Sequence, residues 1–172
     1  MFTKVFLTML NGITADGVAL LTKSKADMKT FLGVPADIPI ITPWVSYVPT
    51  FQGWTPDQVN IFSRRVGDTL QLRGRFRSAS PVATEARLTL GFNGASGSLT
   101  IDAAKNPTTF IAGEWRSTDN SLPNGPVIAF GGVGYLAFSI NTAIFTAQNG
   151  SGVLVATQTM GIRADVPISG WS

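Results

Sequence analysis

The clearest pattern of apolar and polar positions in this chain lies around Gly67-Asp68. After this dipeptide, one side of the alternating pattern carries Leu70, Leu72 and Phe76. The other side carries Gln71, Arg73, Arg75 and Arg77. A period of two with one apolar side predicts a half-buried antiparallel strand. Glycine at the first position of a two-residue loop suits a type II′ turn, because φ is positive there. We therefore predict a β-hairpin that displays a row of cations.

Short strand-like segments continue to the end of the chain, separated by Gly, Pro, Asn and Ser. Besides the hairpin, strands are expected at residues 44–51, 83–92, 98–101, 108–116, 127–130, 133–141, 144–148, 153–162 and 166–171. Residues 54–60 are expected to be loop, and residues 78–81 and 149–152 to be turns. About eight to ten short strands at this spacing predict an all-β domain, an antiparallel sandwich or jelly roll.

The N-terminal part of the chain follows a different pattern. Residues 1–12 are apolar on both sides, which predicts a segment covered either by a partner chain or by the β-domain itself. Asp16 and Ser24 suit the N-caps of two short helices. Gly33 and Pro35 suit the end of the second helix. The sequence thus predicts an arm with one or two short helices before the β-domain.

Three segments are expected along the chain. Residues 1–34 form the arm, which serves attachment and trimerisation; residues 35–43 form a proline-rich linker; residues 44–172 form the β-domain. The side chains expected at the attachment or oligomer interface are Phe2, Phe6, Leu10, Leu20, Leu21, Met28, Phe31 and Leu32.

Residues 18–34 resemble the short helical linker of many tailed-phage fibre and appendage proteins. In that linker a pair of leucines, here Leu20 and Leu21, precedes a capped helix that ends in Leu-Gly. The resemblance implies a position between a virion-attachment end and an exposed β-domain, with packing around a threefold axis. Phe31 departs from the pattern, because small residues are usual at its position.

A second resemblance covers the β-domain and consists of three segments in order, at residues 47–50, 64–70 and 166–171. They read Tyr-Val-Pro-Thr, Arg-Arg-Val-Gly-Asp-Thr-Leu and Val-Pro-Ile-Ser-Gly-Trp. Together they resemble a β-domain found in phage virion and prophage appendage proteins. The resemblance implies a role at the virion surface.

Composition narrows the chemistry that the chain can carry. There are no cysteines and no histidines among the 172 residues, so disulfides, common zinc sites and imidazole-based triads are excluded. The glycine-rich stretches 91–94 and 131–134 lack the lysine and helix of a phosphate-binding loop. We expect no cofactor, no metal and no catalytic residues. Residues 2–10 are too short for a membrane span, so no membrane partner is expected.

One cluster raises the alternative of a glycoside hydrolase. Glu114 stands beside Trp115 and near Asp119, and such enzymes need two carboxylates across a cleft. Scattered carboxylates occur in almost any domain, so the protein is not expected to be an enzyme. Where exposed, the four tryptophans are candidates for sugar stacking or interface anchors. Trp171 is expected to tether the C-terminus.

The cationic row has three possible explanations. Arg73, Arg75 and Arg77, with Arg87 on a neighbouring strand, form a solvated strand face, a contact with an acidic capsid or sister subunit, or a phosphate-binding row. The row lacks the interleaved aromatics that stack on bases, so nucleic acid is not an expected partner.

The sequence and its resemblances lead to one functional expectation. The chain is a structural, homotrimeric protein of a virion assembled in the host cytoplasm, attached through its arm to the major capsid protein or another virion protein. Its size suits a capsid decoration or cement protein, or a short head fibre. The alternative is a tail-fibre or receptor-binding protein that recognises a host surface glycan or protein.

Overall fold

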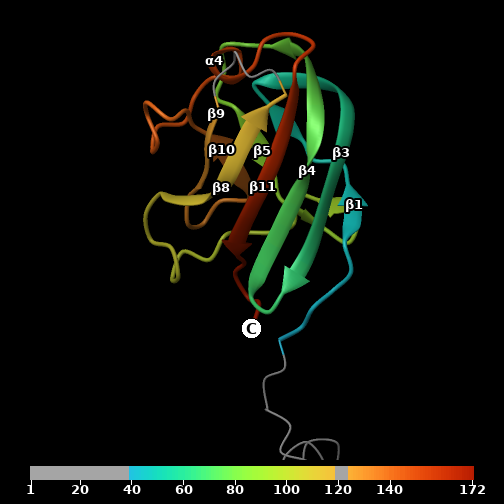
Figure 1. Ribbon diagram of the computed structural model, residues 1–172. Helices are drawn as coiled ribbons and strands as arrows, with labels where there is room; N and C mark the ends of the chain where they lie inside the picture. The colour runs from blue at the N-terminus through green and yellow to red at the C-terminus, as the bar shows by residue number, and fades with distance from the viewer. Residues whose placement is uncertain (1–38, 119–123) are drawn as a thin grey trace, which may run out of the picture. The chain divides into compact units, whose positions relative to one another are not determined.

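The computed structural model describes residues 39–118 and 124–172 (Figure 1). The expected arm, its helices and most of the linker lie outside these residues. So do all of the expected attachment residues: Phe2, Phe6, Leu10, Leu20, Leu21, Met28, Phe31 and Leu32.

The described part of the chain is mostly β-structure with a single turn of helix. Its strands are β1 (Val45–Tyr47), β2 (Phe51–Gln52), β3 (Trp54–Val66), β4 (Thr69–Pro81), β5 (Arg87–Thr89), β6 (Gly91–Phe92), β7 (Ala95–Ser96), β8 (Phe110–Ser117), β9 (Asn124–Ala129), β10 (Tyr135–Phe138) and β11 (Thr159–Pro167). Helix α4 (Gly150–Val153) precedes β11. The all-β prediction is thereby confirmed.

Nine of these strands form one antiparallel sheet in the order β1-β3-β4-β11-β8-β9-β10-β5-β2. The sheet curls strongly, because β2 at one edge runs through Gly53 directly into β3 near the other edge. Gly53 has a φ of +83°, so the chain can turn there between β2, which pairs with β5, and β3, which pairs with β1 and β4. Figure 1 shows β3, β4 and β11 side by side as long strands on one wall of this curled sheet.

The core fills the inside of the curled sheet. On β4, Leu70, Leu72 and Phe76 are all buried, as the alternating pattern predicts. The Phe76 ring lies 5.2 Å from the ring of Trp54, which in turn contacts Phe138 at 4.8 Å. The inner face of the hairpin is thus anchored to strands from both halves of the sheet.

The β3–β4 hairpin confirms the predicted turn and is longer than predicted. Val66 pairs with Thr69 around the two-residue loop, and Gly67 has a φ of +62°. Residues 54–60 were expected to be loop and residues 78–81 a turn, but they pair as the far end of the same hairpin. Two register shifts beside Pro56 accommodate a residue that cannot donate a ladder hydrogen bond.

Other strand predictions need correction nearer the C-terminus. Residues 144–148 form no strand, and Ile144 and Phe145 are exposed rather than paired into the sheet. Residues 98–101 contribute one isolated bridge, between Ile101 and Ile168. The two strands expected at 153–162 and 166–171 are replaced by one, β11, and the expected turn at 149–152 lies at α4.

The β-domain begins before the expected boundary. The compact unit starts at Pro39, and the Gly67 N–H donates to the Ile40 carbonyl at 2.8 Å. The Arg65 N–H donates to the Thr42 side-chain oxygen Oγ1 at 2.9 Å. The last residues of the expected linker are therefore hydrogen-bonded to the hairpin.

Candidate interaction site on the outer face of the sheet

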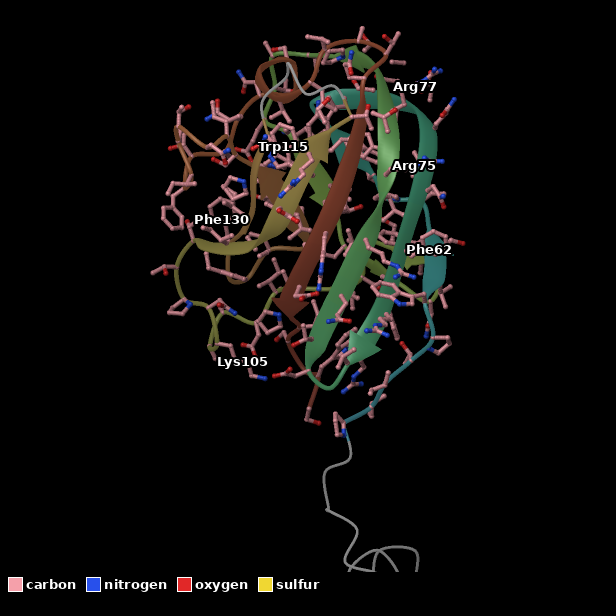
Figure 2. The ribbon with its side chains drawn as sticks, in the orientation of Figure 1. Phe62, Arg75, Arg77, Lys105, Trp115 and Phe130 are labelled. Atoms are coloured by element: carbon pink, nitrogen blue, oxygen red, sulfur yellow. The ribbon has the colours of Figure 1, made fainter. Side chains whose placement is uncertain are left out.

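The outer side of β3, β4, β11 and β8 carries a group of arginines that we call the arginine face. Its members are Arg64, Arg73, Arg75, Arg77, Arg116 and Arg163. The pairing register places them there: Arg163 lies opposite Arg73, and Arg116 lies opposite Gly161, which in turn lies opposite Arg75. Because side chains alternate along a strand, all six point away from the buried core. Figure 2 shows Arg75 and Arg77 on this outer side.

At the centre of the arginine face, Arg73 and Arg75 of β4 have no carboxylate directly opposite them on the neighbouring strands β3 and β11. Arg73 lies between Phe62 on β3 and Arg163 on β11, so one of its two direct neighbours has the same charge. Arg75 lies between Asn60 and Gly161. Like charges directly opposite one another destabilise a sheet. The sheet thus places Arg73 and Arg163 side by side, although this like-charge pairing does not stabilise the fold.

Glu114 and Asp165 are the carboxylates nearest to Arg163 in the register. Glu114 lies opposite Arg163 on β8, but its Oε2 accepts a hydrogen bond from Arg116 at 3.2 Å. Asp165 lies two residues further along β11 and is exposed. Within residues 39–118 and 124–172, neither Arg75 nor Arg163 forms an ion pair.

Trp44 holds two of the arginines in fixed positions. The guanidinium of Arg73 lies 4.1 Å from the centre of the Trp44 ring, and that of Arg64 lies 4.7 Å from it. Arg64 also donates from Nε to Gln71 Oε1 at 2.8 Å. Cation–π contacts of this kind contribute about 0.5–2 kcal/mol each and restrict the side chains before any partner binds.

Arg77 differs from the central arginines because it already has an acidic partner. Its guanidinium forms a bidentate ion pair with the two carboxylate oxygens of Asp57. The hydrogen bonds from Arg77 lower the pKa of Asp57 below its ordinary value. The charge of Arg77 is therefore partly balanced within the domain.

We expect Arg77→Gln to raise the pKa of Asp57 back toward about 3.9, the value of an unpaired carboxyl. A lowered pKa means that the ion pair stabilises the folded state above the unfolded-state pKa, and that this contribution is lost as the pH falls through the folded-state pKa. Carboxyl-detected NMR titration of the parent and the variant measures both values. An unchanged Asp57 pKa would show that the ion pair does not form in solution.

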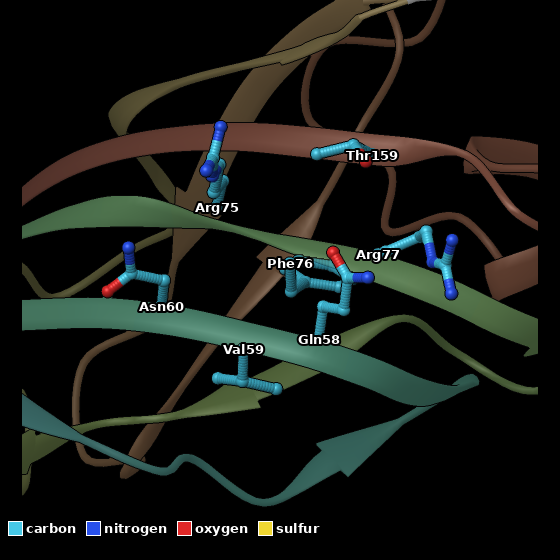
Figure 3. A pocket seen from close by; sticks show the side chains of 7 residues that line it. All are labelled: Gln58, Val59, Asn60, Arg75, Phe76, Arg77 and Thr159. Atoms are coloured by element: carbon cyan, nitrogen blue, oxygen red, sulfur yellow. The ribbon is translucent and has the colours of Figure 1, made fainter.

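Two clefts lie on the arginine face, one after the other along β4. One has a volume of about 390 Å³ and is lined by Trp44, Arg64, Gln71, Leu72, Arg73, Arg163 and Asp165. The other, of about 210 Å³, is lined by Gln58, Val59, Asn60, Arg75, Phe76, Arg77 and Thr159 (Figure 3). Arg73 and Arg163 line the first cleft, and Arg75 lines the second. Both clefts are open and polar, which suits a charged partner that lies across the sheet.

Arg87 does not belong to this face, which corrects the prediction that it extends the row. It lies on β5, which pairs with β10 and β2, whereas the neighbours of β4 are β3 and β11. Arg87 Nε donates to Glu85 Oε1 at 2.6 Å, and the guanidinium lies 4.2 Å from the centre of the Tyr135 ring. Its charge is engaged within that part of the sheet.

The proposed pairing of Glu114 with an aromatic platform is also not present. Trp115 is 1% exposed, and its Nε1 donates to the Ser139 carbonyl at 2.6 Å inside the core. Glu114 lies on the opposite side of the strand and is exposed. Asp119 lies outside the described residues. A sugar held against Glu114 would therefore not contact the Trp115 ring.

The other tryptophans also have structural roles. Trp54 is buried, and its Nε1 donates to the Gly150 carbonyl at 3.0 Å. The rings of Trp171 and Phe92 pack edge to face with their centres 5.1 Å apart. The guanidinium of Arg65 lies over the Trp171 ring. These contacts hold the C-terminal end against the domain, as expected for Trp171.

Sequence reasoning found Arg73, Arg75 and Arg77 and counted Trp44 among the candidate interface anchors, but it missed Arg64, Arg116 and Arg163. The missed residues come from three other segments, and only the strand order shows that they meet. A signal was present in the alternation of residues 160–168, where buried Met160, Ile162, Ala164, Val166 and Ile168 frame the exposed Arg163. Reading that segment as one strand would have added Arg163 to the list of outward-facing cations.

Neither a metal-binding cluster nor a membrane-spanning helix occurs in the part of the chain that the structure describes. Residues 39–118 and 124–172 contain no group of three or more acidic side chains placed to hold a metal ion. In the same residues no helix has both the length and the apolar character needed to span a bilayer. Comparison with protein-family models, characterised proteins and solved structures gives no significant match.

Proposed function

We propose that this chain is a structural, non-catalytic protein of a tailed-phage virion, and that the arginine face is a contact surface for another virion protein. The role would be that of a capsid decoration or cement protein, or of a short head fibre, attached through residues 1–34. The proposal includes a homotrimer that binds the major capsid protein or another virion protein, in particles assembled in the host cytoplasm. It also includes the sandwich-like layering expected from the sequence, which the curled sheet around one core supports.

One structural observation supports the proposed contact surface. Arg73 and Arg163 lie directly opposite each other, and Glu114, opposite Arg163 on β8, accepts its hydrogen bond from Arg116. A free domain gains nothing from such a pair, whereas arginine is enriched at the centres of protein interfaces, where a partner supplies the carboxylate. The phage assignment itself is supported by the sequence resemblances at residues 18–34 and in the β-domain.

The test compares the full chain with a variant that lacks residues 1–33. We expect the truncated protein to stay folded, because its core lies within residues 39–172, and to lose binding to particles purified from the cells that encode the chain. Circular dichroism and thermal unfolding check the fold, and co-sedimentation with particles measures binding. A truncated protein that still decorates the particles would show that the arm does not attach the chain. Absence of the full chain from the particles would contradict the virion assignment.

A second function, recognition of a host surface glycan, is favoured by a different region. An open cleft of about 320 Å³ is lined by Gly113, Glu114, Trp115, Arg116, Asn124, Gly125, Pro126, Asn141 and Ile144. Asn141 Nδ2 donates to Asn124 Oδ1 at 2.6 Å, so two side-chain amides and an exposed carboxylate lie close together. Such groups bind sugar hydroxyls. Binding of the full chain to a glycan array, lost in Asn141→Ala, would support this function over the structural one.

A further inference from the structure

The arginine face has an internal spacing that points to the shape of its partner. Arg73 and Arg75 are alternate residues of β4, so their Cα atoms are about 6.8 Å apart along the strand. Arg163 lies beside Arg73, and Gly161 lies beside Arg75. A Cβ added at Gly161 would meet only the Arg116 carbonyl oxygen, at 3.9 Å, so the space beside Arg75 is open. The face thus presents two successive cationic positions with room above them.

We propose that the arginine face binds an extended, acidic segment of the partner protein, whose alternate carboxylates contact Arg73 with Arg163 and then Arg75. This inference rests on the proposed function, because it names the chemistry of the partner at the same surface. Alternate side chains on one side of an extended chain are also about 6.8 Å apart, so their carboxylates match the two positions. The planar guanidinium can bind each carboxylate through two hydrogen bonds.

The surrounding charges favour a polypeptide over a nucleic acid. Asp57, Glu114 and Asp165 lie around the central arginines and would repel a continuous row of phosphates. Trp44 is covered by the guanidinium groups of Arg64 and Arg73, so its ring is not free to stack on a base. A protein segment can place its own cations opposite these carboxylates and its own carboxylates opposite the arginines.

The test uses the full purified chain and synthetic peptides at about 0.15 M salt, where loose charge attraction is screened. The first peptide alternates Glu and Thr. The second has the same composition with its glutamates in adjacent pairs, and the third carries Gln in place of Glu. A short DNA duplex is the fourth probe. We expect the alternating peptide to bind most tightly, as measured by fluorescence anisotropy.

Two double variants separate the proposed contacts from net charge. Arg75→Gln with Arg163→Gln removes two arginines that form no ion pair within the described residues, whereas Arg87→Gln with Lys105→Gln removes two cations that lie off the arginine face and already have an acidic partner. Both change the net charge equally. We expect the first to weaken binding of the alternating peptide by about tenfold or more and the second by less than about threefold. The first variant should also melt no lower than the parent, because it removes a like-charge pair.

Several results would overturn the inference. They are equal weakening by the two double variants, no preference for the alternating peptide, tighter binding of the duplex than of any peptide, or no peptide binding. None of these results changes the outcome of the co-sedimentation test, because that test measures only whether the chain binds particles. Conversely, peptide binding by a chain that is absent from particles would overturn the virion assignment and keep the acidic-segment inference.

Discussion

Trp115→Ala is expected to lower the free energy of unfolding by about 3–5 kcal/mol, enough to unfold a domain of ordinary stability. Trp115 is 1% exposed and is among the largest fully buried side chains in the described residues. Its removal leaves a cavity and also deprives the buried Ser139 carbonyl of the Nε1–H donor 2.6 Å away. Urea unfolding followed by circular dichroism measures the loss.

Two further variants separate the contributions at this position. Trp115→Phe keeps most of the ring volume and loses the hydrogen-bond donor, so we expect a smaller loss of about 1–3 kcal/mol. Arg116→Ala, next along the strand and exposed, should change stability by no more than about 0.5 kcal/mol. Equal losses in Trp115→Ala and Arg116→Ala would contradict the placement of Trp115 in the core. They would also revive Trp115 as a surface aromatic beside Glu114.

The hairpin was predictable because its signals are local. Alternation from Leu70 to Arg77 fixes which side is buried, and Gly67 at the first loop position fixes the turn and the register. The ends of the hairpin were not predictable in this way. Pro56 and its polar neighbours resemble a loop, and only pairing with the far end of β4 makes them strand. Tertiary pairing there overrides local propensity.

The strand predicted at residues 144–148 is wrong because, within the described part of the chain, no strand pairs with these residues. Residues 144–148 have the residue types of a strand, yet Phe145 is 56% exposed. Such residue types favour a β-strand, but a segment forms a strand only where a neighbouring strand pairs with it in register. The pairing of β11 with β4 joins segments about ninety residues apart, and no local pattern contains that information.

The candidate site shows the same division between local and distant information. The side of β4 on which Arg73, Arg75 and Arg77 lie follows from alternation alone. The identity of the neighbouring cations depends on which strand pairs with β4, and the sequence suggested Arg87 where the sheet brings Arg163. Whether an arginine is available also depends on contacts across strands, since Arg77 is paired with Asp57, twenty residues away.

Gly74→Ala is expected to destabilise the domain by about 3 kcal/mol or more. Gly74 has a φ of +152°, which residues with a side chain rarely adopt. A Cβ at this position would lie 2.2 Å from the carbonyl oxygen of Asn60 and 2.7 Å from the Cα of Ile61. Both are backbone atoms of β3, so relief requires the two long strands to separate. Thermal or urea unfolding of the purified variant measures the effect.

Gly161→Ala provides the matched control one strand away. Gly161 lies opposite Arg75 on β11, and a Cβ there meets nothing closer than 3.9 Å. Because the added methyl group restricts the unfolded chain, we expect this variant to be as stable as the parent, or more stable by about 0.4–1 kcal/mol. Gly74 stands between Arg73 and Arg75, so the tight β3–β4 contact also fixes the positions of the two central arginines. A stable Gly74→Ala protein would show that β3 and β4 are not held at this separation, and the register that defines the arginine face would then be wrong.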